Sequence, residues 1–291
     1  MPPLQFVKIL ADVLFFADGH KLPVDHQKPS GDPKGKQYDK AWQAADKVAV
    51  PKQIPPLFMP AELPNKYYQD ACDTVGGAFH DMMSAMIDAV GFSHNMWKLQ
   101  AKFQNLQVMS VSAIGSPGCL DGPELESNIK NAPMCASWSG NKGKYRDAVA
   151  AGVSKCFKNW MGQVSVPGLP WYPAFAAYPL ASAPPMPNIP MPLITCVSAK
   201  MSDIITPSSM KSEMISAFDG DLKKKDKDKH HESAFNAIAT VLSIAFLMWL
   251  PMQQVMLVMG KGPVPTYAPP FVPVGPVVGG DNISAPGHLM A

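Results

Sequence analysis

The sequence has few charged residues, and almost none of its positive charge is arginine. Charged residues make up 16% of the 291 residues, against about a quarter in ordinary soluble domains, while hydrophobic residues make up 47%. Arg146 is the single arginine. Because the arginine guanidinium is the group that binds phosphate or guanine in a bidentate way, this composition argues against a specific nucleic-acid partner. A surface this poor in charge is instead expected to lie against other subunits or a bilayer.

The cysteines form no pattern that indicates a disulfide framework or a zinc site. There are five, at Cys72, Cys119, Cys135, Cys156 and Cys196, an odd number with no CxxC pair. We interpret them as small buried side chains of a reduced, cytoplasmically assembled protein. The first twenty residues lack a basic segment and a small-residue cleavage site, so no signal peptide is predicted.

Several familiar catalytic motifs are also missing. The sequence has no glycine loop of the P-loop or dinucleotide-binding type, no GxSxG elbow, no HExxH and no kinase motif set. Residues 219–232, DGDLKKKDKDKHHE, resemble a calcium loop only superficially, because Lys223 stands at the third ligand position and the required glycine is absent. We therefore predict no enzymatic activity and no cofactor.

Two groups of chemically capable residues remain, and neither predicts a site. His230, His231 and Glu232 are adjacent and could bind a metal, but a charged run before an apolar helix is typical of solvent-facing capping residues. Cys72 and His80 share one expected helix, where their separation corresponds to about 12 Å of rise, which is beyond hydrogen-bond reach. We predict no catalytic or metal-binding residue.

Apolar periodicity predicts the helices. Residues 4–17 form a short amphipathic pattern whose apolar side consists of Leu4, Val7, Leu10, Val13 and Leu14. A long helix is expected over 69–108, with Gly91 as the position of a kink, and a helix over 145–161 with Val149, Val153, Cys156, Phe157 and Trp160 on one face. The apolar residues of the long helix recur at steps of four and three: Met82, Met86, Ala89, Phe92, Met96, Leu99, Phe103 and Leu106. Such a stripe either faces the core of the protein or mediates self-association of the helix, and the sequence leaves both interpretations open. A short strand and turn are expected just after it, from Val108.

What is abundant is proline, in segments that are also rich in aromatics. Residues 166–192 contain nine prolines among twenty-seven residues, and the other residues are mostly apolar. Proline fixes φ and removes a hydrogen-bond donor, so we expect no central strand here, and the aromatic content argues against a disordered linker. We predict an extended strap that docks on a neighbour. The resemblance between Met161-Gly162 with Val166-Pro167 and Met259-Gly260 with Val264-Pro265 suggests an internal duplication of a helix followed by a strap.

The stretch from Ser233 to Gly260 contains no charged residue. About 20 apolar residues in a helix are enough to cross a bilayer, so a transmembrane helix is one interpretation. A helix buried inside a protein assembly gives the same signal, and the amides of Gln253 and Gln254 find partners more easily there. We favour the buried helix and keep the membrane helix as the alternative.

These features predict a mainly α fold with extended proline-rich straps and few short strands. We divide the chain into a loop-rich arm (1–68), a long helix and turn region (69–144), a helix plus strap (145–220) and a charged run, apolar helix and C-terminal strap (221–291). The expected interface residues are Trp171, Tyr172, Phe175, Tyr178, Tyr267, Phe271, Met96, Leu99 and Phe103.

We expect a structural component of a large homo- or hetero-oligomeric assembly, such as a tailed-phage virion (tail or baseplate) or a related contractile injection apparatus, acting through protein–protein contacts. The alternative is a membrane-associated protein anchored through 233–260. Carbonate extraction would favour the membrane protein, whereas a soluble oligomer of high mass would favour the structural subunit.

Overall fold

The computed structural model describes residues 3–17, 66–171, 182–226, 229–264 and 277–290. The helices are α1 (Lys8–Ala17), α3 (Lys66–Gln100), α4 (Leu125–Lys130), α5 (Gly140–Gly162), α6 (Met201–Ile205), α7 (Pro207–Ala217), α8 (Gly220–Lys225) and α9 (His230–Met252), with the 3-10 helix η3 (Leu193–Thr195). The strands are β1 (Lys102–Phe103), β2 (Gln107–Met109), β3 (Ser112–Gly115), β4 (Leu120–Asp121), β5 (Val164–Pro170), β6 (Ser182–Pro187), β7 (Met191–Pro192), β8 (Val197–Ser198), β9 (Gln254–Val255), β10 (Met259–Pro263) and β11 (Gly280–Asn282).

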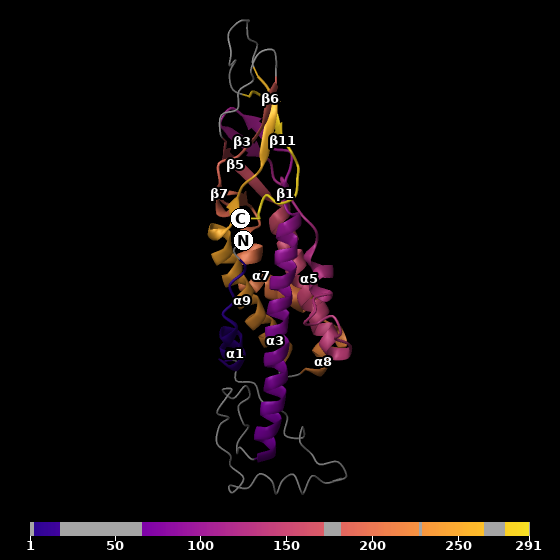
Figure 1. The fold of residues 1–291 in the computed structure, drawn as a ribbon. Helices are drawn as coiled ribbons and strands as arrows, with labels where there is room; N and C mark the ends of the chain where they lie inside the picture. The colour runs from indigo at the N-terminus through magenta and orange to yellow at the C-terminus, as the bar shows by residue number, and fades with distance from the viewer. Residues whose placement is uncertain (1–2, 18–65, 172–181, 227–228, 265–276, 291) are drawn as a thin grey trace, which may run out of the picture.

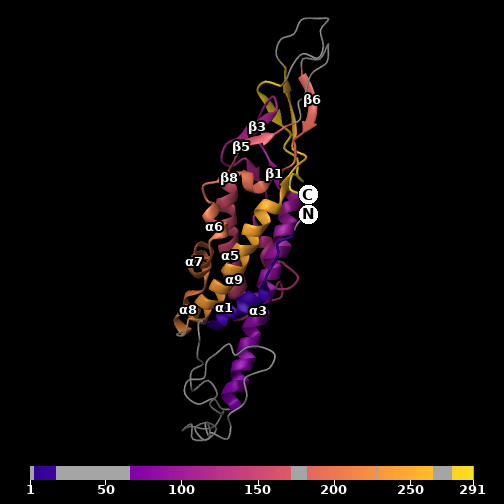
Figure 2. The ribbon, with the colours of Figure 1, turned by 90° about the vertical axis from the view of Figure 1, so that its left-hand side faces the viewer.

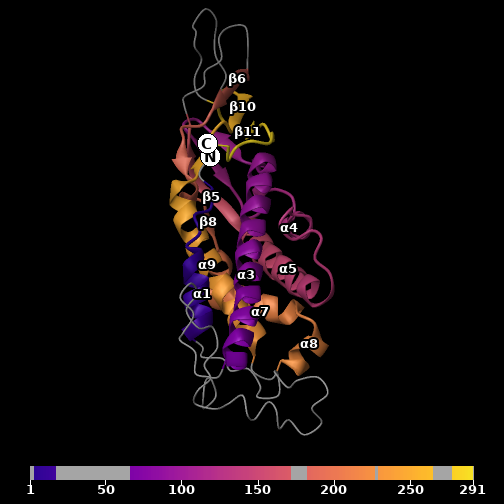
Figure 3. The same cartoon turned by 60° about the horizontal axis from the view of Figure 1, so that its bottom comes forward.

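The described structure is elongated, with a helical part at one end and an antiparallel sheet at the other (Figure 1). The sheet has seven strands in the order β6-β10-β11-β2-β3-β5-β8, and two short pairs, β1-β4 and β7-β9, lie outside it. Within the helical part, α1 and α9 lie on one side of α3, while α4 and α5 lie on the other (Figures 1 and 3). The view in Figure 2 shows α5 and α9 running along the same length of α3.

The prediction of a mainly α fold with few strands is wrong. The described residues are 54% helical and 19% strand, with a seven-stranded antiparallel sheet, so the fold is mixed α/β. The expectation failed because the prolines occupy the positions in a sheet that tolerate them. Pro167 of β5 lies at a register shift opposite Ile114, and Pro184 and Pro185 of β6, an outer strand in this order, lie at a second shift opposite β10.

Trp171 shows how a proline-rich segment is fixed to the rest of the same chain. Its indole Nε1 donates a hydrogen bond to the Met186 carbonyl at 2.8 Å, and its backbone pairs with Asn188. The ring lies against Gly260, where an added Cβ would come within 2.9 Å of the indole. This segment is therefore bound to β6 and β10 of its own sheet.

The helices predicted over 69–108 and 145–161 are present, but the first ends at Gln100, so Phe103 lies in β1 and Leu106 between β1 and β2, not on a helix. The face of α5 that carries Val149, Val153 and Trp160 is buried, and in place of the single strand expected from Val108 the structure has two, β2 and β3, which pair as a hairpin. The prediction for the first helix is confirmed only in part: Leu4, which precedes α1, is buried and Leu10 and Leu14 pack against the core, but Val7 and Val13 are exposed. The most deeply buried side chains of α1 are Ala11 and Phe15, which the prediction did not include.

The apolar stripe of α3 faces the core over part of its length only. Met82, Met86 and Ala89 are buried, whereas Phe92, Met96 and Leu99 are 40%, 38% and 41% exposed. A stripe with a mean step near 3.5 residues drifts around a helix of 3.6 residues per turn, which carries these later residues out to solvent. Gly91 of this helix accommodates the Phe6 ring, which lies 2.7 Å from the position of an added Cβ.

Helix α9 is the one described helix that is long and apolar enough to cross a membrane, and 72% of its most apolar window is buried inside the chain. It contacts α1, α3, α6 and α7. Gln253, just beyond its end, accepts a hydrogen bond from Trp249 Nε1 and donates to the Leu289 carbonyl, both at 3.0 Å. These contacts support the buried-helix interpretation.

The proposed internal duplication does not match the element boundaries. Helix α5 ends at Gly162, as expected, and a strand follows. Helix α9, however, ends at Met252, so Met259 and Gly260 lie within β10 and cap no helix. The two segments share sequence letters but occupy different structural positions.

Candidate functional site

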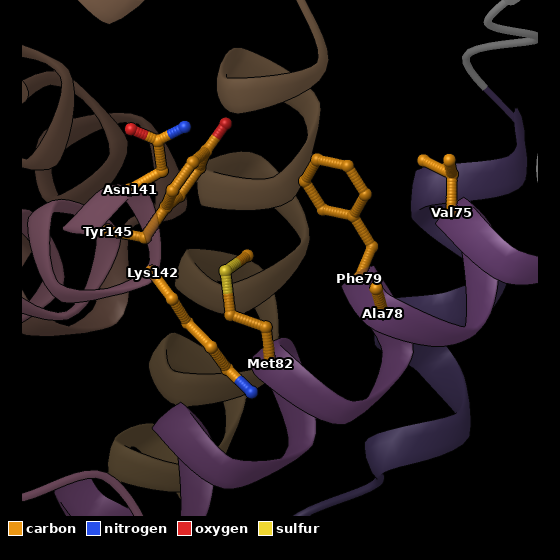
Figure 4. Close-up of a pocket in the computed structure, with 7 residues that line it drawn as sticks. All are labelled: Val75, Ala78, Phe79, Met82, Asn141, Lys142 and Tyr145. Atoms are coloured by element: carbon orange, nitrogen blue, oxygen red, sulfur yellow. The ribbon is translucent and has the colours of Figure 1, made fainter. Parts of the chain in front are cut away.

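A pocket of about 300 Å³ lies between the first half of α3 and the first turns of α5 (Figure 4). Its lining is almost entirely apolar, and the residues that line it are Val75, Ala78, Phe79, Met82, Asn141, Lys142 and Tyr145. The first four come from one face of α3 because they are spaced by three and four residues. The pocket is therefore built from two helices that are distant in the sequence.

Tyr145 closes one side of the pocket. Its ring packs against Phe79 at 6.1 Å and against Phe218 at 4.5 Å between centroids. Burial, together with the negative charge of Asp226, raises the pKa of the Tyr145 hydroxyl well above its usual value. The phenol is therefore neutral at physiological pH.

Asp226 lies behind Tyr145 and organises the start of α9. Its two carboxylate oxygens accept hydrogen bonds from the backbone N–H groups of His230 and His231, and they contact Nδ1 of the same residues at 3.0 and 2.6 Å. Although burial opposes ionisation, these hydrogen bonds hold the pKa of Asp226 well below its usual range. The carboxylate thus caps the helix and orients two imidazoles.

The histidine pair differs from the expected solvent-facing surface. The side chain of His231 is 5% exposed and stacks on Phe218, and that of His230 is 14% exposed. Over the residues that the structure describes, no group of three or more His, Cys, Asp or Glu side chains is placed to hold a metal ion.

Lys142 lies at the opposite end of the pocket from the Tyr145 hydroxyl (Figure 4). Its ammonium lies 4.2 Å from the centroid of the Trp138 ring, a cation–π contact. Arg146, one turn further along α5, donates to the carbonyls of Cys135, Ala136 and Trp138. The single arginine therefore fixes the loop that leads into α5.

A second cluster of polar residues lies deep in the core, where α3, α5 and α9 meet. His94 is fully buried, both its ring nitrogens lack a hydrogen-bond partner among the described residues, and its imidazole contacts the indoles of Trp97 and Trp249. Burial, and secondarily the positive charge of Lys98, holds the pKa of His94 well below its usual value. Burial also lowers the pKa of Lys98 to about 8.

His288 is a third buried histidine, near the end of the described chain. Its Nδ1 accepts a hydrogen bond from the backbone N–H of Phe103 at 2.8 Å, and burial lowers its pKa to about 4. Phe103, one of the predicted interface residues, is fully buried and stacks on this imidazole.

The four cysteines whose side chains are described are buried and unpaired, as the sequence indicates: Cys119, Cys135, Cys156 and Cys196. Burial raises the pKa of Cys119 to about 11 and those of Cys156 and Cys196 to about 12. The thiolate, which is the reactive form, is therefore scarce at neutral pH.

The predicted interface residues fall in three places. Met96 and Leu99 lie on the surface of α3, whereas Trp171 and Phe103 lie in the core of the chain. The remaining five lie outside the described residues: Tyr172, Phe175, Tyr178, Tyr267 and Phe271.

Sequence reasoning missed the pocket because no local pattern links α3 to the start of α5. The sequence feature that could have indicated it is the glycine- and lysine-rich segment after Trp138, because this segment forms the N-terminal turns of α5. Comparison with known protein families, with curated proteins and with solved structures finds no match. Any function proposed for the chain therefore rests on its own residues.

Proposed function

We propose that the protein is a non-catalytic structural subunit that associates with further copies of itself through the exposed apolar side chains of α3. The observation that supports this proposal is the row of Phe92, Met96 and Leu99 along α3, each of which has more than a third of its surface exposed to solvent. At 1.5 Å per residue the line extends for about 10 Å along the helix. Exposed apolar residues gathered in this way are typical of protein–protein contacts.

The neighbouring elements leave this stripe uncovered. On one side Asp88 pairs with Lys8 of α1 at 2.6 Å, and on the other the Ser93 hydroxyl donates to the Leu125 carbonyl of α4. The stripe between them therefore faces outward from α3.

A second copy is the occupant we propose because the spacing of the stripe is that of a coiled-coil seam. Phe92, Met96 and Leu99 follow the d-a-d order of a heptad, and the neighbouring exposed residues Asn95 and Gln100 are uncharged, so two copies would meet without repulsion. The stripe is small for a stable dimer, which usually buries about 1,200–2,000 Å² in total. We expect it to act together with the exposed Ile9 and Val13 of α1 and with Val7 just before it, because α1 packs beside α3.

The assembly in which such a subunit would serve, a tailed-phage tail or baseplate or a related injection apparatus, is proposed on composition alone. The alternative of membrane insertion through 233–260 would require α9 to leave the core, where 72% of its apolar window is buried. Flotation of the purified chain with liposomes would support that alternative, and exclusion from them would count against it.

The test is the oligomeric state by size-exclusion chromatography with light scattering over a range of concentrations. The wild type is expected to exceed the 31.4 kDa of one chain, and the double variant Met96→Lys, Leu99→Glu to shift toward it. The matched control is Met109→Lys, which charges an exposed methionine of β2 that lies outside the stripe. A wild type that stays at one chain throughout, or a double variant that assembles as well as the wild type, would refute the proposal.

A further inference from the structure

We propose that the pocket between α3 and α5 binds a small amphipathic carboxylate, with its apolar body against α3 and its carboxylate at Lys142. The inference concerns a ligand site and goes beyond the structural role proposed above. It rests on the shape and lining of the pocket, on the charges around it and on the position of those charges at one end.

The apolar part of the pocket is supplied by α3. Val75, Phe79 and Met82 form a continuous apolar wall, and Ala78 between them is small, which keeps the entrance open (Figure 4). A volume of about 300 Å³ is at the lower end of the range for small-molecule sites, which are mostly apolar with a few polar groups that fix orientation. A linear or ring-bearing apolar body of modest size fits these dimensions.

The charge at the rim is positive, and no carboxylate of the described residues pairs with it. Over the part of the chain that the structure describes, no carboxylate lies within 4.0 Å of the Lys142 ammonium, although Lys144 pairs with Asp219 at 2.9 Å and Arg146 pairs with Asp147. Lys142 instead lies over the Trp138 ring, which keeps it beside the pocket. An anion at this position could form an ion pair with Lys142 without breaking an ion pair of the described structure.

The start of α5 adds to the positive potential. Asn141 and Lys142 lie in the first turn of this helix of 23 residues, whose N-cap residue, Ser139, makes no side-chain capping hydrogen bond. The N-terminal end of a helix carries a partial positive charge and favours anions. This partial charge adds to the charge of the Lys142 ammonium in making the potential of the pocket positive.

The far end of the pocket is unsuitable for an anion, which fixes the orientation of the ligand. Asp226 is close enough to Tyr145 for its negative charge to raise the pKa of that hydroxyl. A carboxylate beside Tyr145 would meet this charge, whereas an apolar chain would meet the Phe79 and Tyr145 rings. The head group therefore belongs at Lys142 and the apolar body toward Tyr145.

Titration calorimetry with decanoate, decanol and decylamine tests the proposal on the full chain. The three probes share one apolar chain and differ in head-group charge. We expect decanoate to bind most tightly, decanol more weakly and decylamine most weakly. No heat from decanoate below its micelle concentration, or equal affinity for decanoate and decylamine, would overturn the proposal.

Variants locate the binding. Lys142→Gln should weaken decanoate binding about threefold, as expected for an exposed ion pair, and leave decanol binding unchanged. Ala78→Trp should fill the entrance and abolish binding of decanoate and decanol alike. The matched control is Lys158→Gln, an exposed lysine on the same helix that lies outside the pocket. Decanoate binding that survives Ala78→Trp, or that weakens as much in Lys158→Gln as in Lys142→Gln, would refute the assignment.

Discussion

The imidazole of His94 meets the indole of Trp249 edge to face, with the ring centroids 4.4 Å apart and the planes at 89°. Two further aromatic rings, those of Phe157 and Phe246, lie within 6.0 Å of the same imidazole, between centroids. A protonated His94 would place a charge among aromatic rings, away from water and near the positive charge of Lys98, which explains why its pKa is lowered. The packing of α3 against α5 and α9 therefore depends on a neutral histidine.

This relationship predicts that the fold loses stability in mild acid. The folded-state pKa of His94 lies below its unfolded value of 6.5, so the unfolded chain binds the proton more readily. Stability is complete above that value and falls as the pH drops below it, by about 1.4 kcal/mol per pH unit until the folded pKa is reached. Urea unfolding at pH 7, 6 and 5 measures this slope.

The variant His94→Phe should flatten the slope, because it removes the titrating group and keeps an aromatic ring. His80→Gln serves as the control: this histidine lies on the same helix, but its side chain is 39% exposed and contacts Asp12. An unchanged slope in His94→Phe would show that another group, such as His288, dominates the acid response.

Asp226 is expected to be a strong stabilising residue, because it both caps α9 and contacts two buried imidazoles. Asp226→Asn should lower the free energy of unfolding by about 1–3 kcal/mol at pH 7. Since the folded pKa is lowered from 3.8, this stabilisation is present above that value and is lost as the pH falls toward the folded pKa. Chemical denaturation of both proteins at pH 7 measures the loss.

Glu232→Gln is the matched control for Asp226, because Glu232 lies in the first turn of α9, which Asp226 caps, but pairs at 3.3 Å with the exposed Lys229. Its effect should stay below about 0.5 kcal/mol. If the two variants were equally stable, the carboxylate would not have the role that the contacts indicate.

Gly152 allows close approach of α5 and α7, since an added Cβ would lie 2.6 Å from the backbone nitrogen of Met214. Gly152→Ala should therefore destabilise the protein by about 1–3 kcal/mol, although alanine favours the helix intrinsically. The measurement is the thermal or denaturant midpoint. Gly162→Ala, in the last position of the same helix, meets no atom within 4 Å and should be neutral or slightly stabilising.

Local sequence was enough to locate the main helices and a short strand with a turn near Val108. The face of α5 that carries Val149, Val153 and Trp160 is recognisable because helical periodicity depends only on residues three and four apart. The turn between β2 and β3 is equally local. For the first helix the same reasoning was right for Leu4, Leu10 and Leu14 and wrong for Val7 and Val13, because apolar residues surround α1 and only its contacts with α3 and α9 decide which are buried.

The tertiary structure alone decided the sheet, the pocket and the buried polar groups. Strands β5, β6 and β10 contain prolines that suggest straps, and only pairing with distant strands shows that these prolines lie at register shifts and strand ends. The pocket and the enclosure of His94 likewise join helices that are far apart in the chain. Such contacts depend on which surfaces meet in space, and no pattern within a single segment contains that information.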